Sequence, residues 1–392
     1  MENEKICTRE ALMKNRRKLS HVSQIYDLPA SDRYFFCAMM EVTQYHLNHN
    51  RDYARIARSE GFTLHSMKSG SDLYKIPPIP TLYLKKHPSF SMNEKKILFK
   101  VTTSGTSGTK SVVGFDMDSG LLDLEMAVRV LKYHKMFSPK STNYILLGYP
   151  LSRKNKLGIV RTMFGFTLLA PAVHRKYALE KSGEGYELDM EGVIQQLCQY
   201  EEQGLPVRLI GLPGYYYVLL TELKQRGITL HLHPESMICL SGGWKQFYFE
   251  DADKSIIYQL AKEQLAIPDA NCHDFFGAVE HPIVYCDCPN HHFHVPVYSR
   301  VYIRDVDTLE PVGHGEVGIL NLLSPLLKSM PVQSILTDDL AVLHPGESCG
   351  CGNSAPYFEL LGRAGLQDIK TCAAGAEKYL NEELISSIAK NL

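Results

Sequence analysis

Thr102-Thr103-Ser104-Gly105-Thr106-Ser107-Gly108-Thr109-Lys110 is a loop of small polar residues that directly follows an apolar, strand-like run over 97–102. Its two glycines let the backbone turn so that several N–H groups point inward, and the hydroxyls and the Lys110 ammonium group add further donors. Such a loop suits the binding of a polyphosphate, although it is not the P-loop pattern with its Gly-Lys-Ser/Thr ending. The alternative that these residues leave open is a flexible surface loop.

The segments beyond this loop alternate between two kinds of pattern. Short apolar runs typical of strands occupy 144–147, 207–210 and 237–240, and helical periodicity is found over 121–134 and 215–226. This alternation predicts an α/β fold with a mainly parallel sheet. The later stretch 293–323 is richer in strand-like sequence and predicts a smaller, strand-rich part of the molecule.

The first 75 residues are expected to be helical. Ser31 is expected to cap one helix, and a second helix is expected from Asp52 to Glu60. The segment Ile76-Pro77-Pro78-Ile79-Pro80 is expected to be an extended connector, because proline fixes its own backbone and restricts the residue before it. Near the other end, Asn381 is expected to begin a short amphipathic helix.

Composition places the chain among ordinary globular proteins. It has 392 residues, and 42 Lys and Arg against 43 Asp and Glu give a formal net charge of −1. A chain this close to neutral has no overall electrostatic attraction to nucleic acid, and we expect no nucleic-acid partner. No run approaches the roughly 18 apolar residues of a membrane-spanning helix, and the first residues lack the apolar core of a signal peptide. We therefore expect no membrane span and a cytoplasmic location.

Two Cys-x-Cys pairs, at 286/288 and 349/351, stand out among the ten cysteines. Thiolates and imidazoles at this spacing suit tetrahedral Zn²⁺, and glycines at 350 and 352 let two thiolates of one tight turn reach one ion. We predict a structural zinc site without an open position, with the ligands Cys288, His294, Cys349 and Cys351. Cys286 is expected to lie one step early on a strand, His291 and His292 are alternatives to His294, and reduced cysteines without a metal are the alternative to the site.

Several motifs, in this order along the chain, resemble those of the adenylate-forming superfamily of acyl- and aryl-CoA synthetases. The polar loop resembles its phosphate-binding loop. Gly242-Gly243 resembles the glycine pair beside adenine, and Phe276-Gly277-Ala278-Val279-Glu280 resembles the aromatic-Gly-x-x-Glu motif. Thr337-Asp338-Asp339-Leu340 resembles the Thr-Gly-Asp-Leu motif, and Gly362-Arg363 resembles the Gly-Arg pair at the hinge. The segments Ile76–Pro80 with Leu84-Lys85, 241–245 and 279–281 narrow the resemblance to the acyl-protein synthetases of bacterial fatty acid reductase systems.

The resemblance implies roles for individual residues in an ATP site. Residues Thr103–Thr109 and Lys110 would hold the phosphates, and Glu280 would help to hold Mg²⁺. Phe276, Gly277, Gly242 and Gly243 would lie beside adenine, Asp339 would bind the ribose hydroxyls, Arg363 would reach the ribose or a phosphate, and His281 would stack on or polarise the acyl carboxylate. From the residues alone, Glu280 could instead be a buried carboxylate paired with a base, and His281 a packed histidine.

The resemblance also implies a fold and a division of the chain. The expected fold is a multi-layer αβαβα adenylate-forming N-terminal domain with a small strand-rich subdomain and a truncated C-terminal domain. Residues 1–95 are expected to form a helical segment packed on the core, 96–365 the core with a zinc-bound subdomain at about 285–355, and 366–392 a short remnant. The usual C-terminal domain carries a catalytic lysine, which cannot be assumed here.

The expected reaction is the ATP-dependent activation of a carboxylic acid, above all a fatty acid, as an acyl-adenylate. A carboxylate does not react directly with a thiol, so the protein must hold the phosphates and align the attack. By the same resemblance the acyl acceptor would be Cys372, with Lys370 beside it favouring the thiolate, unless Cys372 is a small packed residue. An acyl reductase or acyl carrier would then be the partner. Alternatives are an aryl- or acyl-CoA or acyl-carrier ligase of the phenylacetate-CoA ligase type and a non-catalytic nucleotide-binding subunit.

Overall fold

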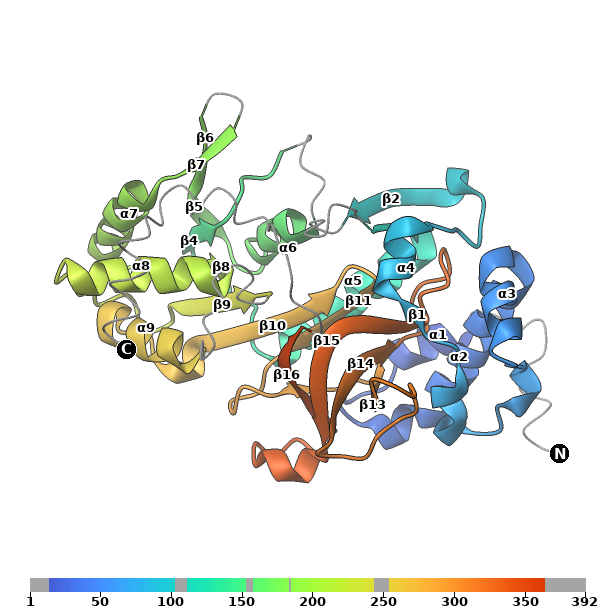
Figure 1. Cartoon of the computed structure of the whole chain (residues 1–392). Helices are drawn as coiled ribbons and strands as arrows, with labels where there is room; N and C mark the ends of the chain where they lie inside the picture. Colours follow the sequence, from blue (N-terminus) through green and yellow to red (C-terminus); the bar gives the residue numbers. More distant parts are fainter. Residues whose placement is uncertain (1–13, 103–110, 153–157, 183–184, 243–253, 364–392) are drawn as a thin grey trace. The chain divides into compact units, whose positions relative to one another are not determined.

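The computed structural model describes residues 14–102, 111–152, 158–182, 185–242 and 254–363 (Figure 1). The chain divides into two compact units, which are described separately. Unit 1 comprises Met1–Thr103, Thr109–Lys135 and Phe276–Leu366, and unit 2 comprises Ser104–Gly108, Met136–Phe275 and Gln367–Leu392. The boundary at Phe275 falls inside one strand, β10 (Cys272–Ala278). The division expected at residue 95 stays a prediction.

Unit 1 opens with the helices α1 (Lys14–Ser20), α2 (Leu28–His49) and α3 (Arg51–Ser59). The expected cap at Ser31 is wrong, because α2 begins before it. The Asp27 side chain accepts a hydrogen bond from the Ala30 N–H, and Pro29 stands in the first turn, where its missing N–H costs no hydrogen bond. The second expected helix is confirmed to within one residue at each end.

The proline-rich connector is extended, as expected, and ends beside a strand from much later in the chain. It follows the short helical turns η1 (Leu64–Ser66) and η2 (Gly70–Lys75). Its strand β1 (Ile79–Pro80) pairs in parallel with β15 (Ser334–His344). Helix α4 (Thr81–Lys86) begins at the next residue, so this pairing fixes the start of α4 against β15.

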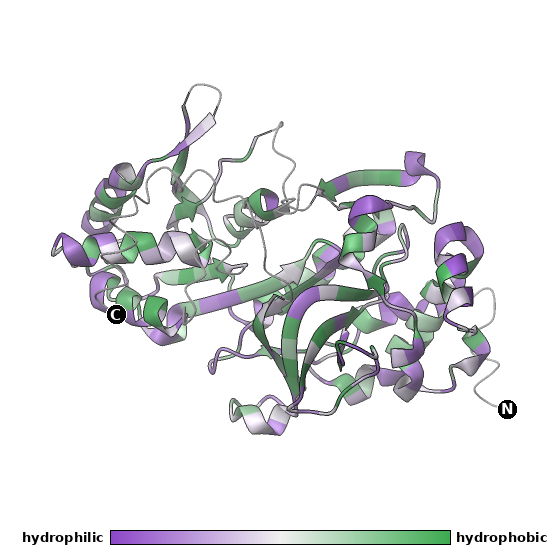
Figure 2. Ribbon diagram, in the orientation of Figure 1, coloured by the Kyte–Doolittle hydropathy of each residue, from purple (hydrophilic) through white to green (hydrophobic). Residues whose placement is uncertain are grey.

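The strand-rich part of unit 1 is a sheet in the order β12–β16–β15–β14–β13, with β1 as a further strand beside β15. Its antiparallel strands are β12 (Phe293–His294), β13 (Arg300–Arg304), β14 (Val317–Leu323), β15 and β16 (Tyr357–Arg363). Figure 2 shows mainly hydrophobic colours along β14 and mainly hydrophilic colours on α3. The strands expected over 293–323 are therefore confirmed.

The polar loop at 103–110 connects two antiparallel strands of unit 1. The strand β2 (Ile97–Thr102), preceded by the turn η3 (Glu94–Lys96), has the bounds expected from the sequence, and it pairs with β3 (Val112–Asp116), Thr102 lying opposite Val112. Helix α5 (Met117–Tyr133) follows at once and begins earlier than expected, because the Asp116 side chain caps it by accepting from the Ser119 N–H. Both ends of the loop are thus held by one strand pair.

Unit 2 contains the parallel sheet that the alternating segments predict. The order is β11–β10–β9–β8–β4–β5, in which every pair from β10 to β5 is parallel; β11 (His281–Cys286) itself belongs to unit 1. The other strands are β4 (Thr142–Leu147), β5 (Ala172–Tyr177), β8 (Val207–Gly211) and β9 (Met237–Ser241), with a hairpin of β6 (Leu179–Ser182) and β7 (Gly185–Leu188). All residues of β4 and β8 are buried, as in sheets covered on both faces.

The helices of unit 2 are α6 (Gly158–Phe166), α7 (Met190–Gln203), α8 (Pro213–Gln225) and α9 (Ser255–Leu265), followed by the turn η5 (Asp269–Asn271). The segment Tyr215–Tyr217 of α8 is buried in the hydrophobic core with residues of β4 and β8. These tyrosines are thus part of the hydrophobic core of unit 2.

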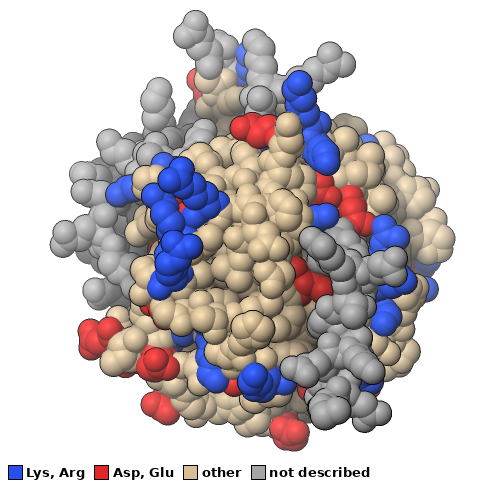
Figure 3. Space-filling model, turned by 90° about the vertical axis from the view of Figure 1, so that its right-hand side faces the viewer, with Lys and Arg blue, Asp and Glu red and all other residues tan. Residues whose placement is uncertain are grey.

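None of the helices in the described parts of the chain is long and apolar enough to cross a membrane. On the face shown in Figure 3, basic and acidic side chains both border a broad area of uncharged residues. This mixture is in keeping with the balanced charge of the sequence.

Candidate active site and Cys/His cluster

Several predicted site residues lie outside the described residues. They are the loop 103–110 with Lys110, Gly243 and Cys372. Gly242 is described: it directly follows β9 with a left-handed backbone, φ 81°, and a Cβ atom there would lie 3.2 Å from the Leu212 side chain. The left-handed backbone therefore favours glycine at the end of this strand.

Glu280 lies in unit 1, in the turn between β10 and β11, and its side chain is almost completely buried, with an exposed fraction of 4%. Burial raises the pKa of its carboxyl group, and the neighbouring Ser111 side chain acts in the opposite direction. Ser111 is the residue that immediately follows the polar loop. The carboxyl group predicted to hold Mg²⁺ thus lies beside the end of the loop predicted to hold phosphates.

Two further charged groups act on Glu280. Lys85 of α4 lowers the pKa of Glu280 and Asp338 of β15 raises it, as expected for an opposite and a like charge. The Lys85 Nζ atom lies 3.8 Å from the Asp338 Oδ2 atom. Sequence reasoning gave neither residue a role in the site. The signals available were Leu84-Lys85 as part of the resemblance and Asp338 as a departure from it, because the motif has glycine at that position.

Asp339 and Arg363 are the two residues that the resemblance assigns to the ribose and phosphates. They lie opposite each other on the neighbouring strands β15 and β16. The Asp339 N–H also donates to the Thr337 Oγ1 atom, 3.1 Å away, while the Thr337 hydroxyl donates to the Leu320 carbonyl oxygen. These bonds fix the backbone that carries the Asp339 carboxylate.

Phe276 and Gly277 end the strand β10. The Phe276 ring is half-buried and contacts the rings of Tyr285, Phe293 and Phe358, with centroid distances of 5.5–6.0 Å. Gly277 is exposed, and a Cβ atom there would lie 3.3 Å from the Ile283 carbonyl oxygen. The ring of Phe276 is thus held in place by an aromatic cluster of unit 1.

His281 is completely buried, which matches the packed-histidine alternative rather than a group facing a substrate. Its Nε2 atom is within hydrogen-bonding distance of the hydroxyls of Tyr285 and Ser299, at 3.0 and 3.3 Å. Burial lowers its pKa to about 3, so the ring is neutral at physiological pH. The reason for the difference from the expectation is that His281 begins β11 and points into the protein.

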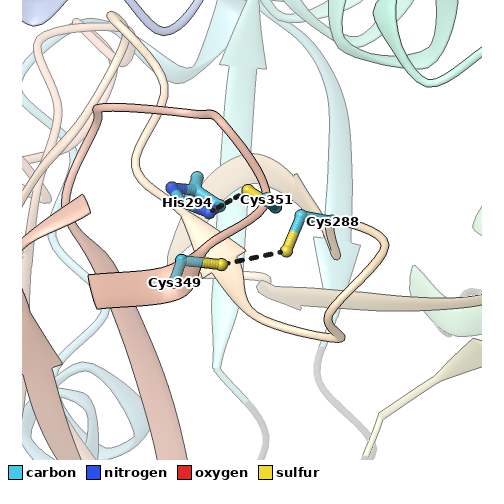
Figure 4. Close-up of side chains that lie close together, drawn as sticks. All are labelled: Cys288, His294, Cys349 and Cys351. Carbon is cyan, nitrogen blue, oxygen red and sulfur yellow. Dashed lines mark hydrogen bonds between the residues drawn. The ribbon is translucent and has the colours of Figure 1, made fainter. Parts of the chain in front are cut away.

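The four predicted zinc ligands converge in unit 1 (Figure 4). One ligand atom from each of them lies within 4.8 Å of all the others. The Sγ atoms of Cys288 and Cys349 are 3.5 Å apart, and the Cys351 Sγ atom is 3.2 Å from the His294 Nε2 atom. Tetrahedral zinc with ordinary bond lengths needs separations of about 3.6–3.8 Å, so these residues could hold such an ion with small adjustments.

Neighbouring groups orient these ligands. The His294 Nδ1 atom lies 2.6 Å from the Ala355 carbonyl oxygen, which leaves its Nε2 atom free of a proton and available to a metal. The Asn290 N–H donates to the Cys288 sulfur, and the backbones of Gly350 and Gly352 are left-handed, with φ values of 73° and 87°. The glycines therefore allow the tight turn that presents Cys349 and Cys351.

The protonation states suit a cluster that is completed by a cation. Burial raises the pKa of Cys288 to about 12 and also raises the pKa of Cys349, and burial lowers the pKa of His294. Buried thiolates without a cation are costly, whereas a bound metal ion displaces thiol protons. Cys286 ends β11 and lies outside this group of four, as expected, and His291 pairs instead with Asp287 at 2.7 Å.

A group of mainly apolar side chains lies beside the ends of β8 and β9 in unit 2. It consists of Thr162, Met163, Phe166, Ile210, Cys239, Leu240, Ser241 and Phe275. These side chains leave no space between them for a ligand.

A family model described as "Acyl-protein synthetase, LuxE" matches residues 30–383. Among curated relatives, the long-chain-fatty-acid–luciferin-component ligase of Vibrio harveyi is 24% identical over 331 residues, which are 84% of each chain. The ligase of the same name from Aliivibrio fischeri is 24% identical over 304 residues, 77% of each chain.

Among solved structures, 2-hydroxyisobutyryl-CoA ligase in an open conformation with 2-HIB-AMP and CoA has a TM-score of 0.65 to this chain. The identity is 16%, and the match covers 87% of this chain and 76% of that one. The same ligase in its thioesterification state has a TM-score of 0.64 at 17% identity and covers 87% and 69%. The similarity confirms the α/β adenylate-forming fold that the motifs predicted.

Proposed function

The chain belongs to the acyl-protein synthetase family and is an adenylate-forming ligase, and on this premise we propose that it activates a long-chain carboxylic acid with ATP and transfers the acyl group to its own Cys372. The curated relatives are named as ligases of long-chain fatty acids, which supports the choice of acid. The alternative acceptors are CoA and a carrier protein.

The observation that carries the proposal is the position of Glu280 beside Ser111, whose side chain lowers the pKa of the Glu280 carboxyl group. It ties the end of the polar loop to the one carboxyl group that the motifs assign to Mg²⁺. Both residues lie in the same unit, so this pairing does not depend on how the two units are placed.

In the first step, a carboxylate oxygen attacks the α-phosphorus of ATP. A new bond forms between that oxygen and phosphorus, the bond from phosphorus to the bridging oxygen breaks, and pyrophosphate leaves with the electron pair. The loop 103–110 with Lys110 would hold the phosphates by its N–H groups, its hydroxyls and its charge. Mg²⁺, with Glu280 among its ligands, would neutralise phosphate charge; the buried Glu280 must lose its proton to take part.

Residues of the motifs that resemble the superfamily would hold the nucleoside part of ATP. Asp339 would accept hydrogen bonds from the ribose hydroxyls, and Arg363 on the opposite strand would reach the ribose or a phosphate. The glycine pair 242–243 and the segment Phe276-Gly277 would lie along the adenine ring.

In the second step, the Cys372 thiolate attacks the carbonyl carbon of the acyl-adenylate. The carbon–sulfur bond forms, the carbon–oxygen bond to AMP breaks, and AMP leaves. The resulting thioester would be passed to an acyl reductase or a carrier, the partner that this product requires.

We also propose that Cys288, His294, Cys349 and Cys351 hold a structural Zn²⁺. The convergence of their ligand atoms supports it, as does the backbone carbonyl at His294 Nδ1. Four protein ligands leave no open position, so the ion would join the turn at 349–351 to the segment 288–294 rather than take part in the reaction.

Exchange of labelled pyrophosphate into ATP tests the first step across aliphatic and aromatic acids. We expect exchange with long-chain acids and its loss in Glu280→Gln. If no acid supports exchange in the wild-type protein, the non-catalytic nucleotide-binding alternative replaces the proposal.

Labelled fatty acid tests the second step. We expect a label on the protein that is acid-stable, is released by hydroxylamine, and is absent in Cys372→Ser but kept in Cys198→Ser, a partly exposed thiol on α7. A label that persists in Cys372→Ser excludes this residue, and label that appears on added CoA instead supports the CoA-ligase alternative.

A further inference from the structure

Lys85 is a lysine with a largely buried side chain, and the structure of its helix does not require this burial. It comes near the end of the short helix α4, and its side chain is largely buried, with an exposed fraction of 11%. Buried lysines are rare unless they are paired. The next residue, Lys86, is exposed, so the helix could have left Lys85 in solvent as well.

The group that faces Lys85 is Asp338 of β15, 3.8 Å from its Nζ atom. At this distance the two groups form an ion pair, but they are too far apart for a hydrogen bond. Among the described residues, the ammonium group makes no hydrogen bond, although it carries three donors. Asp338 therefore neutralises Lys85 in part and leaves its hydrogen-bonding capacity for another acceptor.

The charge around this pair is negative. Asp338 occupies a position that is glycine in the motif that it resembles, so the chain has added a carboxylate beside Glu280. Lys85 acts on both carboxylates. A cation held there without hydrogen bonds is suited to a ligand that brings several negative oxygens of its own.

We propose that Lys85 binds the pyrophosphate part of ATP and stabilises the charge that develops on it when the bond to the α-phosphorus breaks. The geometry points to this end of the nucleotide. Glu280 lies beside Ser111 at the end of the phosphate loop, and Asp338 precedes Asp339, whose carboxylate is assigned to the ribose. Asp338 and Asp339 lie in the part of β15 between Leu336 and Leu340, where the pairing with β14 is irregular.

The pairing of β1 with β15 explains how such a short helix can position a phosphate ligand. Ile79 lies opposite Ile335 and Pro80 opposite Leu336, two residues before Asp338. The prolines of the connector remove backbone freedom on one side, and the strand pair fixes the other. Lys85 is thus held on regular elements rather than on a loop.

This inference rests on the proposed function, and its test separates the two. The variants are Lys85→Met, Lys85→Arg and the matched control Lys86→Met, which removes the same charge from the next position of α4. Pyrophosphate exchange is measured with a long-chain acid, and the binding of ATP, inorganic pyrophosphate and AMP is measured by calorimetry on the full chain.

We expect Lys85→Met to weaken ATP and pyrophosphate binding about tenfold to a hundredfold and to leave AMP binding unchanged, because only the first two carry the phosphates that Lys85 contacts. Lys85→Arg should retain most of the binding, and Lys86→Met should behave as wild type. Equal losses for ATP and AMP, or none for ATP, overturn the inference. If the wild type binds ATP but no acid supports pyrophosphate exchange, the proposed function fails. The comparison of ATP binding with AMP binding then still tests the role of Lys85.

A purely structural role for Lys85 as the partner of Asp338 gives a different result. In that case Asp338→Gly, which restores the residue of the motif, should rescue Lys85→Met. We expect the double variant to remain defective in ATP binding. Asp338→Gly also provides a check if Lys85→Met does not fold. The single variant Asp338→Gly keeps Lys85, so it should still bind ATP more tightly than AMP.

Discussion

Replacing Cys349 by serine is the most direct perturbation of the proposed zinc site. The four ligands come from two segments, 288–294 and 349–351, which are also joined by a hydrogen bond from the Asn290 Nδ2 atom to the Cys349 carbonyl oxygen. A serine hydroxyl is neutral and binds zinc poorly, so three ligands remain and the ion should be lost. We expect one Zn²⁺ per wild-type chain and none in Cys349→Ser.

The cost to stability follows from the binding that is lost. At a free zinc concentration about 1,000 times the dissociation constant, binding stabilises the folded state by about 4 kcal/mol. For a domain of roughly 150–250 residues, each kcal/mol moves the unfolding temperature by about 2–4 °C, so we expect a drop of about 8–16 °C. Treatment of the wild type with a strong chelator should give a drop of the same size, and added zinc should reverse it.

The assay is metal analysis of the purified protein together with thermal unfolding. Cys286→Ser is the matched control, since Cys286 is also buried and lies two residues from Cys288 but outside the group of four. It should keep its zinc. Wild-type protein without zinc, or a Cys349→Ser variant that retains it, would refute the site; loss of zinc in Cys286→Ser would refute the choice of ligands.

Three further predictions concern charged groups of unit 1. Glu280→Gln keeps the shape of the side chain and removes a charge that burial disfavours. The rate of pyrophosphate exchange should therefore fall at least about a hundredfold, while the urea midpoint of unfolding at pH 8 stays the same or rises. Retained exchange would contradict the role of Glu280. Asp339→Asn should raise the KM for ATP about tenfold and leave that for the acid unchanged, and an unaltered ATP constant would exclude the ribose contact. Burial raises the pKa of Asp123 on α5 from 3.8 to about 7, so the folded state holds this proton more tightly than the unfolded state, and stability falls as the pH rises through that window. Asp123→Asn should remove this fall in urea titrations between pH 4 and 8, whereas Glu125→Gln, at an exposed position of α5, should not.

The parts of the fold that could be predicted are those with local causes. The apolar, strand-like run at 97–102 predicts the observed bounds of β2. The continuous apolar runs predict β4, β8 and β9, because buried parallel strands need apolar residues on both faces. The convergence of Cys349 and Cys351 with the other two residues of the Cys/His cluster was predictable for the same reason, since a Cys-x-Cys turn with two glycines restricts its own geometry. The start of α2 was missed because two local signals compete there, and Asp27 with Pro29 prevails over Ser31.

What could not be predicted depends on contacts between distant segments. The burial of His281 follows from the direction in which β11 enters the protein, and nothing in the residues around it indicates that direction. Lys85 was visible next to the proline connector, and Asp338 was visible as a departure from the motif, but each on its own is an ordinary charged residue. Only the pairing of β1 with β15 brings them to 3.8 Å. An added negative charge in a phosphate site is unfavourable unless a cation comes with it, so the departure at Asp338 is itself an argument that the lysine opposite it has a role in that site.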